Sequence, residues 1–324
     1  MGTAPRVAPI GTAARTGGSF RTTSLRTMFA MMSARRLFPA LLLAPAVAFV
    51  PRVAAAQCVV QATSAEARLM AFFVVPLAFS GAVQPDQLRP GQFRVSVDAA
   101  LMPSADQSLR PTNCYAAAKG ETTNLASIFP RPRLAVGLPF DLEAEVSWVP
   151  PLQVKDAKAN LVGLALAWTR RMAILAGAGV IVQARAHTLI GSVEGPITCN
   201  IDALQANNTQ PCYGKTISND RFTPNVSGGE LAVAFDAGDY AVFGSVGVNS
   251  MDPEFRVNFA NGAGYVPTPS VDNTQIKFAE RLNRTALSGG ATWRIFRGLD
   301  LTGQLYTSLD DTSISRIIFT YHTR

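Results

Sequence analysis

The residues best suited to catalysis in this 324-residue chain are His187, Ser192 and Glu194, which lie within eight positions of one another. A histidine can take the proton of a serine hydroxyl and a carboxylate can orient the histidine, so these residue types suit nucleophilic catalysis. The sequence does not show that the three side chains converge. A single histidine on a polar strand face more commonly belongs to a hydrogen-bond network, and a hydrolase is therefore the weaker of the two interpretations.

Charged side chains that alternate with apolar ones form a second group. Between residues 133 and 151, leucine, valine and tryptophan occupy every second position over most of the stretch, with arginine and carboxylates among the residues between them. Alternation with a period of two predicts β-strands that have one apolar and one polar face. We expect the charged residues of these polar faces to form one network: Arg94, Asp98, Arg133, Asp141, Glu143, Glu145 and Arg185.

Neither a metal site nor a cofactor site is predicted. The four cysteines are not spaced as zinc ligands, and no C-x-x-C pair occurs. The segment GAGVIV at 177–182 lacks the third glycine of a dinucleotide-binding motif and lies in a strand-like context. Enzymatic activity is left open, with a non-enzymatic role favoured.

Residues 1–56 read as an N-terminal extension and a signal peptide. Arg35 and Arg36 precede an apolar run at 37–51, and an alanine triplet ending at Ala56 offers a cleavage site. The run has three prolines and falls short of the roughly 20 residues that span a bilayer as a helix. Met1, Met31 and Met32 are all possible starts.

The basic net charge belongs to this N-terminal segment. Residues 1–56 hold seven of the 29 basic residues and none of the 22 acidic ones, which leaves 22 of each in residues 57–324. A neutral remainder gives no support to a nucleic-acid partner.

The rest of the chain contains about ten strand-length segments, within a range of eight to twelve. Long polar connections alternate with tight turns, and no apolar run after residue 57 reaches 18 residues. If this part of the chain is embedded in a membrane, it must form a closed barrel, because an open sheet edge would leave backbone groups unsatisfied in hydrocarbon. The charged fraction of only 16% and the aromatics near strand ends favour a lipid-facing surface.

Across about residues 90–324 this pattern resembles the bacterial outer-membrane β-barrel proteins of Gram-negative cells. The last strand resembles the assembly signal of that class, with Ile317, Phe319 and Tyr321 alternating outward, although the chain ends on His322-Thr323-Arg324. The resemblance implies an all-β, antiparallel, up-and-down transmembrane barrel with periplasmic turns and outer loops. It implies outer-membrane lipid, lipopolysaccharide and the barrel assembly machinery as partners, with no surface ligand specified. A soluble, exported lipocalin-like barrel would show the same alternation with the apolar face inward.

The domain boundaries follow from this reading: 1–56 is removed, 57–90 precedes the barrel, and 91–324 forms it. Thr63 and Glu66 fit a capping box, which predicts a helix over about 64–74 that ends before Pro76. We expect this helix either to plug the barrel or to pack on its rim.

Four cysteines in an exported chain predict disulfides. Cys199–Cys212 is the natural local bridge, worth about 3 kcal/mol in the chain-entropy model. An even strand number places both chain ends, and therefore Cys58, at the periplasmic end. Cys58 and Cys114 could then pair only if the N-terminal segment threads the barrel.

The favoured function is a structural or surface-interaction role carried by the long loops at 103–130, 189–228 and 251–274. A ten-strand barrel is narrow, and the charged network is expected to fill most of its bore. The alternatives are a narrow channel or transporter, a membrane hydrolase that uses His187, and the soluble lipocalin-like barrel.

Overall fold

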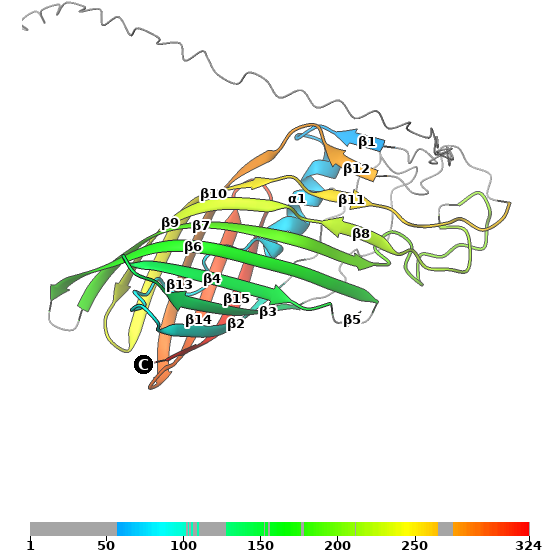
Figure 1. Ribbon diagram of the computed structural model, residues 1–324. Helices are drawn as coiled ribbons and strands as arrows, with labels where there is room; N and C mark the ends of the chain where they lie inside the picture. The colour runs from blue at the N-terminus through cyan, green and yellow to red at the C-terminus, as the bar shows by residue number, and fades with distance from the viewer. Residues whose placement is uncertain are drawn as a thin grey trace, which may run out of the picture. The chain divides into compact units, whose positions relative to one another are not determined.

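The computed structural model describes residues 57–323, with gaps at 102, 104, 106–108, 110–127, 152, 155, 176–177, 211 and 265–274. The predicted signal peptide, the loop at 103–130 for the most part, and Cys114 lie outside the described residues. Within this part of the chain the main feature is an antiparallel β-barrel (Figure 1).

Ten strands close the barrel, which confirms the predicted fold. Each pairs antiparallel with the barrel strand before and after it in the chain, and the last pairs with the first. The strands are β2 (Phe93–Leu101), β3 (Ile128–Gly137), β4 (Leu142–Val149), β6 (Ala157–Leu175), β7 (Ala178–Gly195), β9 (Val226–Asp236), β10 (Tyr240–Met251), β13 (Leu282–Phe296), β14 (Leu299–Ser308) and β15 (Thr312–His322). The two-residue strand β5 (Gln153–Val154) pairs with the start of β6.

The alternation in the sequence determines which side chains enter the barrel. In β2, Arg94, Ser96 and Asp98 are buried, whereas Val95 and Val97 between them are exposed on the outside. The same period of two sorts polar residues inward and apolar residues outward along β3 and β4.

The two ends of the barrel differ. One end carries tight turns, such as the one between β3 and β4, where Phe140 and Asp141 adopt left-handed φ angles of 65° and 61°. The other end carries the long connections between β2 and β3, β7 and β9, and β10 and β13. We call these the tight-turn end and the long-loop end.

A small sheet extends the wall at the long-loop end, and we call it the rim sheet. It consists of β8 (Asp220–Thr223), β11 (Glu254–Arg256), β12 (Gln275–Phe278) and β1 (Gln57–Val60). The strand β8 pairs with the last residues of β7, and β1 pairs parallel with β12. One face of the rim sheet, with Phe222, Phe255 and Ile276, packs into the hydrophobic core.

The predicted helix is present as α1 (Ala65–Leu77), and it packs inside the long-loop half of the barrel (Figure 1). Met70 and Val74 belong to the same core cluster as Leu161 and Met251 of the wall. The N-cap is Ser64, whose side chain accepts a hydrogen bond from the Ala67 amide at 3.1 Å, rather than Thr63. Among the described residues, no helix combines the length and apolar character needed to cross a membrane.

The helix also continues through Pro76, beyond its predicted end. Proline removes one hydrogen-bond donor and disfavours the helical conformation in the residue before it. Here a side chain of the barrel wall stabilises the last turn of the helix, because Arg131 donates hydrogen bonds to the Pro76 and Leu77 carbonyls.

The prediction that Cys58 lies at the tight-turn end is wrong. Cys58 lies in β1, which is part of the rim sheet at the long-loop end. Residues 61–92, which we call the luminal segment, run from there through the barrel to the start of β2 at the tight-turn end. The prediction used only the number of barrel strands and did not include the crossing of the barrel by the luminal segment.

Wall residues are shaped to accept the luminal segment. Gly163 in β6 faces Phe79, and a Cβ at this position would lie 2.6 Å from the Phe79 Cγ and 2.5 Å from the Ser147 Oγ. We predict that Gly163→Ala destabilises the folded protein by about 1–3 kcal/mol through overpacking. The measurement is urea unfolding in lipid vesicles, followed by the mobility of unheated samples on gels.

The matched control is Gly303→Ala in β14, where a Cβ meets nothing within 4 Å. This variant is expected to unfold within about 0.5 kcal/mol of the native protein. Equal destabilisation by both substitutions would show that Phe79 does not pack against Gly163.

Candidate functional site

The most distinctive group of polar contacts surrounds the backbone of residues 76–80 in the middle of the luminal segment. Arg131 donates to the carbonyls of Pro76, Leu77 and Ala78 at 3.3, 2.9 and 3.2 Å. Because these carbonyls belong to the last two residues of α1 and to its C-cap residue, the positive guanidinium also meets the negative end of the helix dipole.

Three further arginines extend this set along the same backbone. Arg185 donates to the Phe79 carbonyl at 2.6 Å, and Arg133 to the Ser80 carbonyl at 3.0 Å. Arg316 donates to the Ala78 carbonyl at 3.3 Å and to the Ser80 hydroxyl at 2.7 Å. We call Arg131, Arg133, Arg185 and Arg316 the four luminal arginines. They come from β3, β7 and β15, so the segment is held from several sides of the barrel.

The Phe79 ring lies among three of these guanidinium groups. The central carbons of Arg133, Arg185 and Arg131 lie 4.6, 4.9 and 5.8 Å from the ring centroid. Phe79 has no exposed surface. Cations over a desolvated aromatic ring are attracted by its electron-rich face, so Phe79 adds favourable contacts to the hydrogen bonds of its own backbone.

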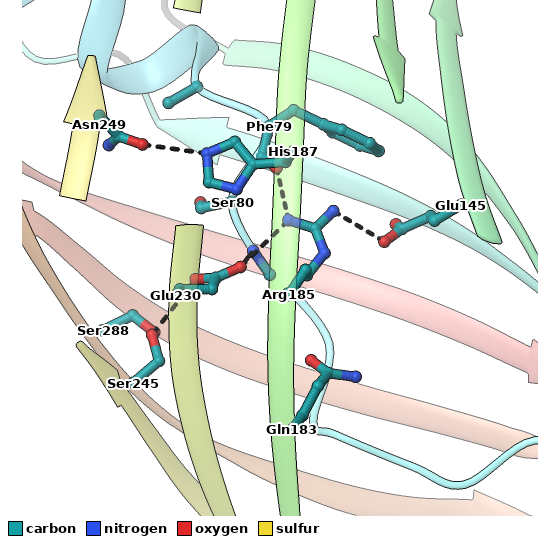
Figure 2. Close-up of polar contacts among 12 residues, drawn as sticks. Phe79, Ser80, Glu145, Gln183, Arg185, His187, Glu230, Ser245, Asn249 and Ser288 are labelled. Atoms are coloured by element: carbon teal, nitrogen blue, oxygen red, sulfur yellow. Dashed lines mark hydrogen bonds and ion pairs between the residues drawn. The ribbon is translucent and has the colours of Figure 1, made fainter. Parts of the chain in front are cut away.

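Buried carboxylates balance two of the luminal arginines. Arg133 pairs with Asp98 at 2.6 Å and with Glu145 at 3.1 Å. Figure 2 shows Arg185 between Glu145 and Glu230, at 2.9 and 3.1 Å. The side chains in these pairs are at most 7% exposed, so the charges are almost fully desolvated.

A fifth arginine, Arg94, pairs with Glu143 at 2.5 Å and is equally buried. Arg131 and Arg316 form no ion pair among the described contacts. Arg131 donates to three carbonyls of the luminal segment, and Arg316 donates to one carbonyl and one hydroxyl of that segment and to Gln304. The wall thus presents more arginine than carboxylate at this level, and the backbone of the segment supplies the remaining acceptors.

Between residue 80 and the tight-turn end, the luminal segment stays in contact with the wall. The Gly81 amide donates to Glu230 at 2.5 Å, and its carbonyl accepts from Gln304 at 2.6 Å. At the tight-turn end Gln87 donates to Asp141 at 2.7 Å, and the Gly91 amide bonds to the Gly137 carbonyl at 3.0 Å.

The structure brings six of the seven predicted network residues into ion pairs: Arg94, Asp98, Arg133, Glu143, Glu145 and Arg185. Asp141 lies apart at the β3–β4 turn and contacts Gln87 rather than an arginine.

Sequence reasoning did not place Arg131, Glu230 or Arg316 in the network. Arg316 directly precedes Ile317, which was predicted to face outward, so alternation could have assigned it inward. Glu230 likewise directly precedes the alternating apolar residues Leu231, Val233 and Phe235, so the same rule could have assigned it inward. Arg131 lies between Pro130 and Pro132, and prolines argue against a strand assignment.

The predicted catalytic residues are not brought together. His187 Nε2 contacts the Asn249 Oδ1 at 3.0 Å (Figure 2). Asn249 in turn donates to the Tyr306 hydroxyl at 2.6 Å. Glu194 lies at the rim, where it pairs with the exposed Arg221 at 3.8 Å. No described contact joins His187 to Ser192 or Glu194, so the histidine belongs to a polar chain in the wall.

The predicted disulfide Cys199–Cys212 is confirmed, with a Cα–Cα distance of 5.5 Å. It lies in the connection between β7 and β9. Cys58 is also disulfide-bonded. Within the described part of the chain, no group of three or more His, Cys, Asp or Glu residues is arranged to hold a metal ion.

Comparison with known proteins identifies no family for this chain. No family model matches the sequence, and no curated protein matches it. Among solved structures, Ail of Yersinia pestis, in complex with the heparin analogue sucrose octasulfate, matches at 8% identity, over 72% of this chain and 99% of Ail, with a TM-score of 0.27. The translocator domain of the autotransporter NalP from Neisseria meningitidis matches at 8% identity, over 74% and 90% of the two chains, with a TM-score of 0.27.

The toluene transporter TodX of Pseudomonas putida matches at 10% identity, over 82% of this chain and 77% of TodX, with a TM-score of 0.22. Because all these scores are low, the architecture described above rests on the strand pairing of this chain itself.

The buried ion pairs yield a direct test. We predict that Arg133→Met destabilises the protein by about 3–5 kcal/mol, because Asp98 loses its partner in a desolvated site. Arg221→Met is the matched control, since its pair with Glu194 is solvent-exposed and worth about 0–1 kcal/mol. Urea unfolding of both variants in lipid vesicles measures the difference. Similar, small losses for both would mean that the interior of the barrel is hydrated.

Proposed function

We propose that this chain is an outer-membrane β-barrel, kept closed by its own luminal segment, that acts through the surface at its long-loop end. The observation that carries the proposal is the distribution of polarity. The middle of the bore holds buried charged side chains bonded to one another or to the luminal segment, and the exterior of the barrel is apolar. A soluble lipocalin-like barrel would have the reverse arrangement.

Every barrel strand contributes to the apolar exterior. Each exposes at least one large aliphatic side chain on the outside, and one example per strand, from β2 to β15, is Val95, Leu134, Val146, Leu164, Ile190, Leu231, Val242, Leu287, Leu305 and Ile317. Soluble monomers rarely expose continuous apolar patches of this extent. Hydrocarbon is the solvent that suits such a surface, and outer-membrane lipid is therefore the proposed environment.

Aromatic side chains gather on the exterior near the tight turns. Tyr240 and Trp293 are directly opposite one another on β10 and β13, and both are about half exposed. Trp168 and Tyr321 lie close to the tight-turn ends of their sheet partners β4 and β14. A band of aromatics at this height is typical of the membrane interface.

The long-loop end offers the surface for interaction. It carries the rim sheet and the disulfide-bonded connection, and it exposes Val59, Ile201 and Ile217 to solvent. In the proposed orientation this surface lies among lipopolysaccharide outside the cell. The last strand, β15, would be the part that the assembly machinery recognises.

The closed interior argues against a wide channel. The luminal segment occupies the bore, and its backbone is bonded to arginines from β3, β7 and β15. A channel or transporter would require this segment to move and leave several arginines without acceptors.

We predict that the purified protein shows no large, stable conductance in planar lipid bilayers. The same preparation should migrate differently in unheated and boiled samples on gels, because a membrane barrel typically stays folded in unheated detergent. Long-lived openings of a size typical of porins, seen in a sample that passes the mobility test, would contradict the closed barrel and favour the transport alternative.

A further inference from the structure

The path of the luminal segment determines on which side of the membrane the N-terminal strand β1 lies. Strand β2 begins at the tight-turn end, where the Phe93 amide donates a hydrogen bond to the Thr323 hydroxyl oxygen at 3.0 Å. The start of the barrel and the last described residue of the chain therefore lie together at this end.

Strand β1 lies at the opposite end. It pairs with β12 over four residues, from Gln57 with Gln275 to Val60 with Phe278. Strand β12 is joined through β11 and β8 to Val193–Gly195, which are the last residues of β7 on the long-loop side. The position of β1 is thus fixed by a continuous series of strand pairings.

The contacts between these two points occur in the order expected of a chain that descends through the barrel. Along β3, Arg131 contacts residues 76–78, Arg133 contacts residue 80, and Gly137 contacts residues 91 and 92. The segment therefore runs in the same direction as β3, from the long-loop end to the tight-turn end.

The segment is also long enough for the distance. Helix α1 has 13 residues and accounts for about 20 Å. The residues that follow it, up to β2, can extend by about 3.3 Å each. Together they exceed the roughly 30 Å of a hydrocarbon core.

We infer that the processed chain has its two ends on opposite sides of the outer membrane, with β1 at the cell surface and the end of β15 in the periplasm. The luminal crossing adds to the ten strands and makes the number of crossings odd. The barrel thereby carries its own N-terminal end outward, and the N-terminal strand becomes part of the interaction surface. This inference rests on the proposed membrane location and orientation and on the predicted cleavage after Ala56.

Three single cysteine substitutions at exposed positions test it. Gln61→Cys reports on the turn between β1 and α1, Asp310→Cys on the long-loop end, and Asp239→Cys on the tight-turn end. Each is treated with a maleimide linked to a polymer too large to pass through porins, on intact cells and on cells with a permeabilised outer membrane. The unsubstituted protein is the blank, because the described residues include no free cysteine.

Labelling of Gln61→Cys and Asp310→Cys on intact cells, with Asp239→Cys labelled only after permeabilisation, is the expected result. Unheated gel mobility verifies that each variant is folded. If Asp310→Cys is labelled on intact cells and Gln61→Cys is not, the N-terminal strand is periplasmic and the inference is wrong, while the proposed barrel stands.

Two other results would contradict both the proposed function and the inference that rests on it. One is labelling of Asp239→Cys, but not Asp310→Cys, on intact cells, which would invert the barrel. The other is recovery of the folded protein in a detergent-free soluble extract.

Discussion

The structure depends on one exchange of hydrogen bonds, between the four luminal arginines and the backbone carbonyls of residues 76–80. These residues include the end of a helix and a stretch with no strand partner, so their carbonyls need hydrogen-bond donors from side chains. The arginines, in turn, are buried and cost a large desolvation free energy unless they are paired. Each partner thus offsets the free-energy cost of burying the polar groups of the other.

This mutual dependence explains why the polar groups inside the barrel fit the luminal segment in particular. The carboxylates Asp98, Glu145 and Glu230 are too few to satisfy all the luminal arginines, and Arg131 and Arg316 rely on the luminal segment. A barrel that closed over an empty bore would leave these two groups without most of their present acceptors. The same contacts that order the luminal segment therefore also complete the wall and close the bore.

Much of the barrel could be predicted from the sequence, because strict alternation assigns every residue of a strand to one of two faces. The positions of Arg94, Asp98, Glu143 and Arg185 followed from this rule, and local spacing was enough for the Cys199–Cys212 bridge. The rim strands were not predicted. They have only three or four residues each and are stabilised by pairing with distant parts of the chain rather than by a local pattern.

The direction of the luminal segment was also beyond the sequence. It is determined by the long-range pairing of β1 with β12, about 220 residues apart, and by arginines on several strands. Arg131 was missed for a related reason. The prolines on either side of it argue against a strand, but the pairing of β3 with its neighbours places it in one. Local patterns thus specified which face a side chain occupies, whereas only the fold specified which segment it meets.

The central claim is that the exterior of the barrel meets hydrocarbon. Nitroxide side chains introduced one at a time from Leu231 to Phe235 of β9, in protein reconstituted into lipid vesicles, test it most directly. We expect high accessibility to dissolved oxygen at Leu231, Val233 and Phe235, and low accessibility to oxygen and to a water-soluble nickel complex at Ala232 and Ala234. High accessibility to the nickel complex at the three apolar positions would contradict the account.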